Sequence, residues 1–154
     1  MDIVFTGQYE AAVEEGRITL ASAMRAAMPQ DTGSLWVFCG IFPCLFLVTE
    51  DTWNKLSEPY QNVPLDDTRG MLVQQRIGTA KRVNIDRMGR MVIPQHLWDW
   101  AGISEKCWVR GCLRRVELWA PERLREHEAN LLSVPSLLDV LRVSERSPAA
   151  VQQG

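Results

Sequence analysis

The chain has 154 residues, of which 46% are hydrophobic and 23% are charged, and its formal net charge at neutral pH is −2. These values are typical of one globular domain that buries about two-thirds of its unfolded surface. The longest apolar run, residues 35–48, is interrupted by Gly40 and Pro43 and is shorter than the about 20 residues that span a membrane. The first ten residues lack a basic region and a long apolar core, so we expect no signal peptide, no membrane partner and a location in the cytoplasm.

Charge is unevenly distributed along the chain. Residues 1–67 carry 3 basic and 10 acidic side chains, residues 68–90 carry 6 and 1, and residues 91–154 carry 8 of each. A single net-positive stretch of this kind suggests an anionic partner. A solvated surface that neutralises the acidic half of the molecule explains the same pattern equally well.

Two halves of the chain resemble each other. Gly16-Arg17 aligns with Gly89-Arg90 at an offset of 73, Trp36-Val37 aligns with Trp108-Val109 at an offset of 72, and residues 45–53 resemble residues 116–124 at an offset of 71. Internal similarity of this kind predicts two copies of one structural unit. The predicted organisation is a first repeat over 1–57, a linker and connecting helix over 58–77, a second repeat over 78–130, and a C-terminal helix and disordered tail over 131–154.

Each copy is predicted to begin with a strand and a loop ending in Gly-Arg, followed by a short strand (18–20 and 91–93) and a short helix. Two further strands follow, at about 106–110 and 114–119 in the second copy, and a closing helix starts at Pro121. One copy has too little apolar surface to be stable alone. We therefore expect an α+β fold in which both copies pack into one β-barrel.

The short helix of the second copy has clear sequence signals. Pro94 suits the first helical position, and Gly102 suits the left-handed residue that follows the last turn. Leu97, Trp98 and Ala101 give this helix an apolar face.

Two more helices are predicted outside the repeated strands. The connecting segment 67–78 should be helical with three side chains facing partly inward, namely Met71, Leu72 and Gln75. Residues 136–143 should form an amphipathic helix, and the polar tail 144–154 should be disordered.

The loop Asp86-Arg87-Met88-Gly89-Arg90 ends the basic stretch. In an ordinary hairpin, Asp86 would accept hydrogen bonds from backbone N–H groups and Gly89 would adopt a positive φ. A turn requires neither Arg87 nor Arg90, and arginine pairs bidentately with guanine. We therefore interpret these arginines as DNA-binding residues, the alternative being solubilising surface charges.

The strand before this loop adds two candidate phosphate contacts. Arg82 and Asn84 alternate with apolar Val83 and Ile85, so both polar side chains should point outward beside the loop. In the first copy, Gly16 and Arg17 occupy the positions that match Gly89 and Arg90.

Signals for catalysis and metal binding are weak. The four cysteines form two C-x4-C pairs, but they lie in strand-like apolar segments, where free cysteine behaves as a small buried hydrophobe. The two histidines, His96 and His127, form no recognisable catalytic grouping with a serine or cysteine. We predict no enzyme activity, no cofactor, no metal and no small-molecule substrate. The six tryptophans occupy core-like positions rather than a platform for single strands: Trp36, Trp53, Trp98, Trp100, Trp108 and Trp119.

Four segments together resemble the MraZ family of bacterial transcriptional regulators of the division and cell-wall gene cluster: GQYEAAVEEGRITLASAMR, CLFLVTEDTW, GTAKRVNIDRMGRMVIPQHLWDWAGI and VELWAPERL. The resemblance covers about residues 4–128. It implies two tandem AbrB-like swapped-hairpin units packed into one pseudo-twofold β-barrel with short flanking helices. It also implies a nucleoid-associated homo-oligomeric ring that binds short G-rich promoter repeats in double-stranded DNA, with Asp86 and Arg90 facing the DNA.

The first copy departs from the family pattern D-x-K-G-R-L-x-I-P. It is one residue shorter before Gly16, it lacks the basic residue, and Ala21 replaces the proline. Glu14 and Glu15 place negative charge beside Arg17, which repels phosphate. Two hypotheses follow, a sequence-specific regulator of transcription and a ring-forming interaction protein whose DNA binding has decayed.

Overall fold

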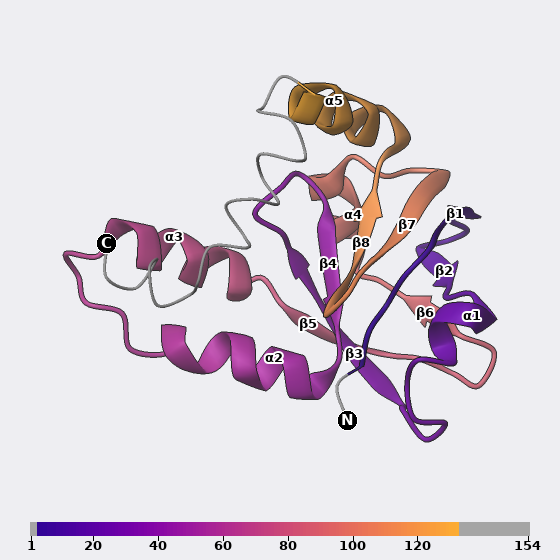
Figure 1. Cartoon of the computed structure of the whole chain (residues 1–154), viewed down its shortest axis with the longest axis horizontal. Helices are drawn as coiled ribbons and strands as arrows, with labels where there is room; N and C mark the ends of the chain where they lie inside the picture. Colours follow the sequence, from indigo (N-terminus) through magenta and orange to yellow (C-terminus); the bar gives the residue numbers. More distant parts are fainter. Residues whose placement is uncertain (1–2, 133–154) are drawn as a thin grey trace. The chain divides into compact units, whose positions relative to one another are not determined.

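The computed structural model describes residues 3–132, which fall into two compact units divided after Pro121 (Figure 1). The predicted helix over 136–143 and the predicted tail over 144–154 lie outside the described residues. The described part of the second unit, residues 122–132, belongs to one helix, α5 (Pro121–Leu132), which begins at the predicted proline. No helix of residues 3–132 is long and apolar enough to cross a membrane.

The first unit contains an antiparallel sheet of six strands in the order β1-β7-β8-β4-β3-β5 and a separate two-stranded ribbon, β2-β6. The sheet strands are β1 (Gln8–Ala12), β7 (Lys106–Cys112), β8 (Arg115–Trp119), β4 (Leu45–Val48), β3 (Ser34–Cys39) and β5 (Lys81–Asn84). The ribbon consists of β2 (Arg17–Thr19) and β6 (Arg90–Val92). The predicted strands in both halves are therefore confirmed, with boundaries shifted by one or two residues.

Helices cover different parts of this sheet. Figure 1 shows α2 and α3 side by side along one side of the sheet, and α1 close to the ribbon. Their bounds are α1 (Ser22–Arg25), α2 (Glu50–Ser57), the 3₁₀ turn η1 (Glu58–Tyr60), α3 (Thr68–Ile77) and α4 (Gln95–Ala101). Polar caps fix where the longer helices begin: Thr49 Oγ1 accepts the N–H of Thr52, and Asp67 Oδ1 accepts the N–H of Gly70.

The main core lies between the sheet and the elements that carry the two Gly-Arg segments. Alternating residues of β3 point into it, including Leu35 and Val37, because successive side chains of a strand face opposite sides. The ribbon contributes Ile18 and Met91, and α4 contributes the fully buried Trp98. Burial of these apolar side chains fixes the ribbon against the sheet, each contributing roughly 1.5–3 kcal/mol.

The strands of the two halves are exchanged. β1 pairs with β7, where Tyr9 faces Val109, and β5 pairs with β3, where Val83 faces Leu35. The offset of 72 found in the sequence relates the two pairings: Ala11 pairs with Cys107 in the first, and the residues aligned with them, Val83 and Leu35, pair in the second. In the ribbon Ile18 faces Met91. These two residues align with each other at the offset of 73, so one alignment describes both the sequence and the strand pairing.

The prediction of a closed β-barrel is wrong for the residues that the structure describes. Within residues 3–132, β1 and β5 are edges of an open sheet, and β2 and β6 pair with each other. The backbone of the ribbon meets the segments that precede it at isolated bridges, Glu14 with Arg17 and Ile85 with Met91. At each of the two loops a tight turn leads the backbone out of the sheet. The ribbon therefore covers the core by side-chain packing and does not continue the hydrogen-bonded ladder of the sheet.

Two details of the helices also differ from expectation. Helix α3 forms as predicted, but Leu72 is 58% exposed and Gln75 is also exposed, while Gly70 and Ile77 are buried. The side of α3 that faces inward is therefore the one that carries Gly70 and Ile77, and Gly70 packs so closely that an added Cβ would come within 2.8 Å of a Val63 methyl carbon. In α4, Pro94 is the N-cap rather than the first helical residue, and Gly102 has the predicted left-handed φ of 69°.

The tryptophans divide between core and surface. Trp98 and Trp119 are buried as predicted, whereas the other four are only partly buried. Trp36 stacks on Trp53 with ring centroids 4.7 Å apart on the sheet face away from the main core. The prediction of core positions is therefore wrong for Trp36, Trp53 and Trp108, whereas Trp100 is partly buried and packs against the main core.

That second face of the sheet holds a buried ion pair. Glu117 is 4% exposed and lies directly opposite Phe46 on the neighbouring strand. Its carboxylate accepts from Arg115 Nε at 2.8 Å and from Trp119 Nε1 at 2.9 Å. The Arg115 guanidinium also stacks over the Phe46 ring, 4.7 Å from its centroid. The carboxylate is thus compensated by two side chains of its own strand, Arg115 and Trp119, and Phe46 of the strand beside it packs on the arginine.

The cysteines behave largely as predicted. Cys39, Cys44 and Cys107 are buried and Cys112 is partly exposed, all as free thiols. Burial raises the pKa of the Cys107 thiol to about 12. Residues 3–132 contain no group of three or more side chains suited to hold a metal ion.

Candidate nucleic-acid interface

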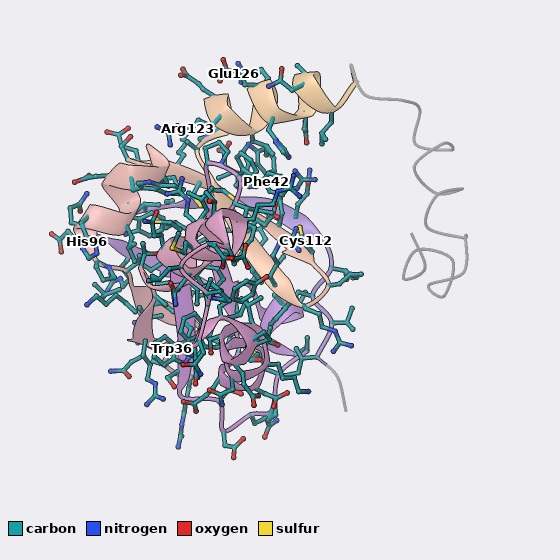
Figure 2. The ribbon with its side chains drawn as sticks, turned by 90° about the vertical axis from the view of Figure 1, so that its left-hand side faces the viewer. Trp36, Phe42, His96, Cys112, Arg123 and Glu126 are labelled. Carbon is teal, nitrogen blue, oxygen red and sulfur yellow. The ribbon has the colours of Figure 1, made fainter. Side chains whose placement is uncertain are left out.

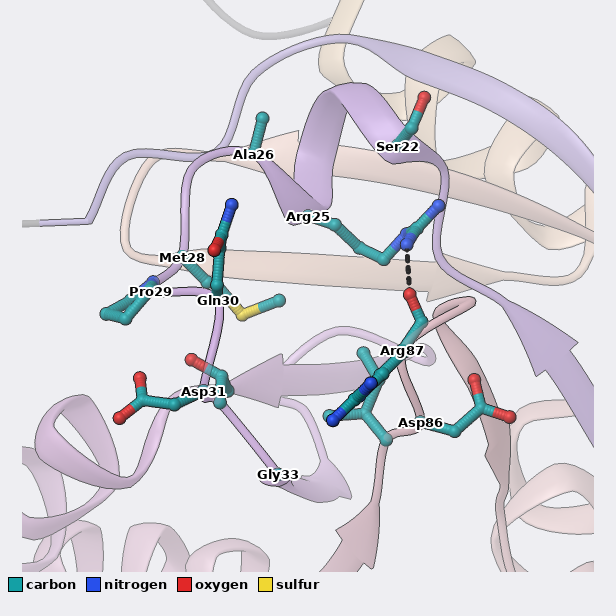
Figure 3. Close-up of a pocket in the computed structure, with 12 residues that line it drawn as sticks. Ser22, Arg25, Ala26, Met28, Pro29, Gln30, Asp31, Gly33, Asp86 and Arg87 are labelled. Atoms are coloured by element: carbon teal, nitrogen blue, oxygen red, sulfur yellow. Dashed lines mark hydrogen bonds between the residues drawn. The ribbon is translucent and has the colours of Figure 1, made fainter.

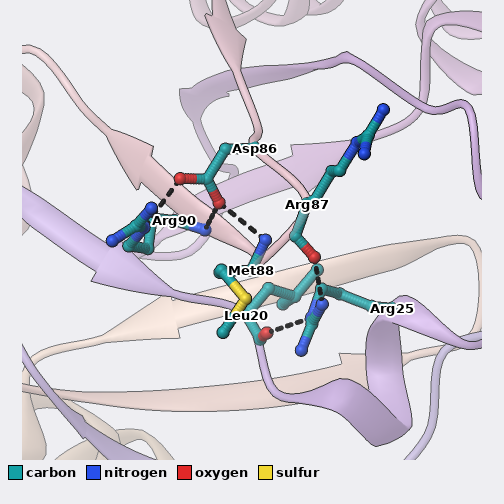
Figure 4. Close-up of polar contacts among 6 residues, drawn as sticks. All are labelled: Leu20, Arg25, Asp86, Arg87, Met88 and Arg90. Atoms are coloured by element: carbon teal, nitrogen blue, oxygen red, sulfur yellow. Dashed lines mark hydrogen bonds and ion pairs between the residues drawn. The ribbon is translucent and has the colours of Figure 1, made fainter.

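The loop between β5 and β6 is a hydrogen-bonded turn organised by Asp86. The Gly89 N–H donates to the Asp86 carbonyl at 3.0 Å, and Gly89 has a φ of 84°. The Asp86 carboxylate accepts the N–H groups of Met88 and Arg90, both at 2.9 Å (Figure 4). The predicted roles of Asp86 and Gly89 in structuring the loop thus match the geometry.

Arg90 also takes part in this loop. Its Nε donates to Asp86 Oδ2 at 2.7 Å, although about half of the Arg90 side chain remains exposed. Arg90 thus has a structural role in this turn in addition to the DNA-binding role predicted for it. The backbone N–H of Arg90, then its side chain and the Met88 N–H, hold the pKa of Asp86 below its ordinary value. The carboxylate stays ionised and fixes the direction of the Arg90 side chain.

The two arginines of the loop point to opposite sides. In Figure 4 the Arg87 side chain extends away from Asp86, while Arg90 folds against it. Arg87 lines an open hollow of about 1090 Å³ beside α1 (Figure 3), and Arg90 lines another of about 390 Å³ beside β1. Met88, 61% exposed, lies between them at the tip of the loop. The loop can thus address an anionic ligand on two sides.

The ribbon brings Arg17 and Arg90 onto one exposed face. In its register Arg17 faces Val92 and Thr19 faces Arg90, and all four side chains are exposed. The two arginines therefore lie diagonally across the ribbon, within reach of long side chains. Glu14 lines the same hollow as both arginines and places a negative charge near them.

The loop of the first half is a tighter turn. Glu14 and Arg17 exchange backbone hydrogen bonds of 3.0 and 2.9 Å around Glu15 and Gly16. Both central residues have positive φ, 52° and 75°, as in a two-residue type I′ hairpin. This turn has no room for the carboxylate-centred network seen at Asp86, because it is one residue shorter.

Arg82 and Asn84 point outward as predicted, since the residues that alternate with them, Val83 and Ile85, are buried. Arg82, however, pairs with Glu50 of α2 and stacks over the Trp36 ring at 5.2 Å. The structure thus ties Arg82 to α2 and β3 instead of grouping it with Arg17 and Arg90.

Three residues near the site were missed by the sequence reasoning: Thr19, Arg25 and Val92. Thr19 and Val92 complete the exposed face of the ribbon, which only the strand register reveals. Arg25 donates from Nε to the Leu20 carbonyl at 3.0 Å and from an Nη to the Arg87 carbonyl at 2.6 Å. Its contact with Arg87 spans 62 residues of sequence, so no local pattern could have indicated it.

The two histidines lie in different units of the structure. His96 lies exposed on α4 (Figure 2), and its neighbour Leu97 is buried in the core. His127 lies on α5, in the second compact unit.

Comparison with known proteins identifies the family of the chain. A model of the MraZ family, described as "MraZ protein, putative antitoxin-like", matches residues 77–139. A protein of Treponema denticola named "Transcriptional regulator MraZ" is 34% identical over 117 residues, which cover 74% of this chain and 80% of that protein. Proteins with the same name from Syntrophomonas wolfei and Clostridium beijerinckii are 30% and 29% identical over 84% and 88% of this chain. This chain belongs to the MraZ family.

Proposed function

We propose that this protein is a transcriptional regulator that binds double-stranded DNA in a sequence-specific manner. The observation that carries the proposal is the exposed ribbon face on which Arg17 and Arg90 lie diagonally, next to a loop ordered by Asp86. A two-stranded ribbon of this kind fits into the major groove, where arginine pairs bidentately with guanine. The relatives named as transcriptional regulators support the same role.

The finer parts of the proposal come from the family resemblance. They are a homo-oligomeric ring, binding to short promoter repeats of the division and cell-wall gene cluster, and a location in the cytoplasm at the nucleoid. Asp86, Gly89 and Gly16 would structure the loops, while Arg90, Arg87 and Arg17 would contact DNA. Arg82 and Asn84 remain candidate phosphate contacts, of which Arg82 would first have to leave Glu50. We propose no catalytic activity, cofactor or small-molecule substrate.

We also propose that the first unit consists of two AbrB-like swapped-hairpin repeats, over about 1–57 and 78–130, joined by the linker and helix of 58–77. The exchange of β1 and β5 between the halves supports this proposal. The pairing of Ile18 with Met91, and of Phe46 with Glu117, places aligned residues opposite each other, as a pseudo-twofold axis requires.

The test is binding to the DNA upstream of the protein's own gene, with a scrambled fragment of equal length and composition as control. A regulator should prefer the upstream fragment, and its affinity should fall steeply with salt because phosphate contacts release counterions. Equal and salt-insensitive binding to both fragments would instead favour a ring-forming interaction protein. That alternative has one structural observation on its side, the Glu14 carboxylate beside Arg17.

A further inference from the structure

We infer that each half of the chain positions the loop of the other half, and that Arg25 of the first half is the positioning residue for the DNA-reading loop 86–90. The inference rests on the proposed function for its consequence at DNA, but the contact itself is independent of it. It also explains what the first half, with its altered loop, contributes to the site.

The loop 86–90 is anchored to the first half at two carbonyl groups. The Leu20 N–H donates to the Gly89 carbonyl at 2.7 Å, and the Arg25 guanidinium donates to the Arg87 carbonyl at 2.6 Å (Figures 3 and 4). Arg25 also donates to the carbonyl of Leu20, the residue whose N–H binds Gly89. Its guanidinium therefore links Leu20 to Arg87. Such a planar, multiple donor can bridge two carbonyls, which a lysine ammonium on a flexible stem does less well.

The converse contact is made at the aligned positions. The Ile93 N–H and Trp98 Nε1 of the second half both donate to the Gly16 carbonyl, at 2.9 and 3.0 Å. Leu20 and Ile93 align at the offset of 73, and so do Arg25 and Trp98. Each loop is therefore held by a backbone N–H and a side chain at aligned positions of the other half. The side chain is the Arg25 guanidinium for the loop 86–90 and the buried Trp98 indole for the loop at Gly16.

The geometry leaves little space between the loop and its anchor. A Cβ added to Gly89 would come within 2.6 Å of Arg25 Cδ and Nε, so the loop backbone packs directly against this side chain. Arg87 and Arg90 flank the anchored carbonyls of Arg87 and Gly89. Removal of the Arg25 hydrogen bonds should make the loop more mobile, so that the distance between the Arg87 and Arg90 side chains varies more.

Local changes in the first half favour this role. Ala21, where the family pattern has proline, keeps an N–H that donates to the Tyr9 hydroxyl at 2.7 Å, and that hydroxyl donates to the Thr19 carbonyl at 2.9 Å. The segment from Thr19 to Arg25 is thus fixed to β1 just before it reaches the loop. The first half has lost the family loop motif but retains a rigid support for the second.

The experiment compares Arg25→Ala and Arg25→Lys with Arg69→Ala, which removes the same charge from an exposed position on α3. The first measurement needs no DNA. Hydrogen exchange at the amides of Met88, Gly89 and Arg90 should become about three- to tenfold faster in Arg25→Ala, the effect of losing one hydrogen bond of ordinary strength. Amides of β8 should not change, and neither should the loop amides of Arg69→Ala. Unchanged exchange in Arg25→Ala would overturn the inference.

The second measurement separates positioning from charge. Arg25→Ala should weaken binding to the upstream DNA about three- to tenfold per engaged loop, without changing the slope of affinity against salt. Arg25→Lys should rescue little of this loss. Full rescue by lysine, or a shallower salt slope in Arg25→Ala, would show that Arg25 acts as a phosphate contact and would overturn the inference. If exchange responds as expected but no variant and no DNA fragment shows specific binding, the positioning role stands and the proposed function fails.

Discussion

Arg17 and Arg90 lie on the same exposed face of a two-stranded ribbon, although they are 73 positions apart in the chain. They belong to pairs two steps apart in the ladder, with Val92 and Thr19 as their direct partners. The spacing of this diagonal is fixed by the buried pair Ile18 and Met91 beneath it. The surface that we propose to face DNA is therefore built by both halves together.

The first prediction concerns this pair of arginines. Arg90→Ala should cost about 1–3 kcal/mol per engaged site if Arg90 pairs with a guanine. Arg17→Ala should cost less, because Glu14 lines the same hollow and offsets its charge. Titrations of the upstream DNA with both variants measure the difference. Equal losses would mean that the two loops contribute equally.

Arg87 should behave differently from Arg90, since its side chain extends to the other side of the loop. Arg87→Ala should weaken specific and scrambled DNA alike and reduce the salt slope by about 1, as loss of one phosphate contact does. Binding isotherms at several salt concentrations test this. A loss confined to the specific fragment would assign base recognition to Arg87 instead.

A third prediction uses two glycines with nearly the same backbone conformation. Gly7 and Gly89 have φ values of 87° and 84°, but a Cβ would meet nothing within 4 Å at Gly7. Gly7→Ala should therefore cost only the strain of the left-handed region, about 1–2 kcal/mol. Gly89→Ala should cost more, because its methyl group would press on the Leu20 carbonyl and Arg25. Denaturant unfolding of both variants gives the comparison, and equal losses would contradict the packing of this loop.

The order of the loop should depend on pH through Asp86. Its lowered pKa means that the ionised form is favoured in the folded protein, so this contribution is present above the unfolded pKa of about 3.9 and is lost as pH falls through the folded value. The Asp86 carboxyl carbon should titrate with a midpoint below 3.9, and the amide signals of Met88 and Arg90 should move with it. In Asp86→Asn these amide signals should show no such transition.

The fifth prediction is the assembly that the family resemblance implies. Light scattering at micromolar concentration should give a homo-oligomer well above a dimer. The acidic N-terminal half and the basic stretch 68–90 of a neighbouring copy are complementary in charge, so salt should shift the equilibrium toward smaller species. A monomer mass at low salt would rule out the ring.

Much of the fold follows from local patterns. Alternation in β5, the left-handed Gly102 and the proline at the start of α5 are short-range signals, and all were recognised. The turn at Asp86 and Gly89 was predicted for the same reason. Leu72 and Gln75 were misplaced because the apolar pattern of α3 is weak, and the residues that the helix buries, Gly70 and Ile77, do not stand out in that pattern.

What the sequence could not show is how distant strands align. The open sheet in place of a closed barrel depends on where the ribbon leaves the ladder, and the partners of Arg82 and Arg25 lie 32 and 62 residues away. The internal repeat gave the offsets, but the exchange of strands between the halves is a property of three-dimensional packing. Thr19, Arg25 and Val92 could therefore be recognised only in the structure.

The pair formed by Phe46 and Glu117 bears on why the two halves are one polypeptide. These residues align with each other and face each other, so in a dimer of identical repeats each would meet its own copy. Two glutamates at that buried position would repel each other. Here a phenylalanine takes one side, and the arginine that neutralises Glu117 rests on its ring. The inequality of the two halves thus disfavours pairing of the second half with a copy of itself at this position and favours its pairing with the first half of the same chain.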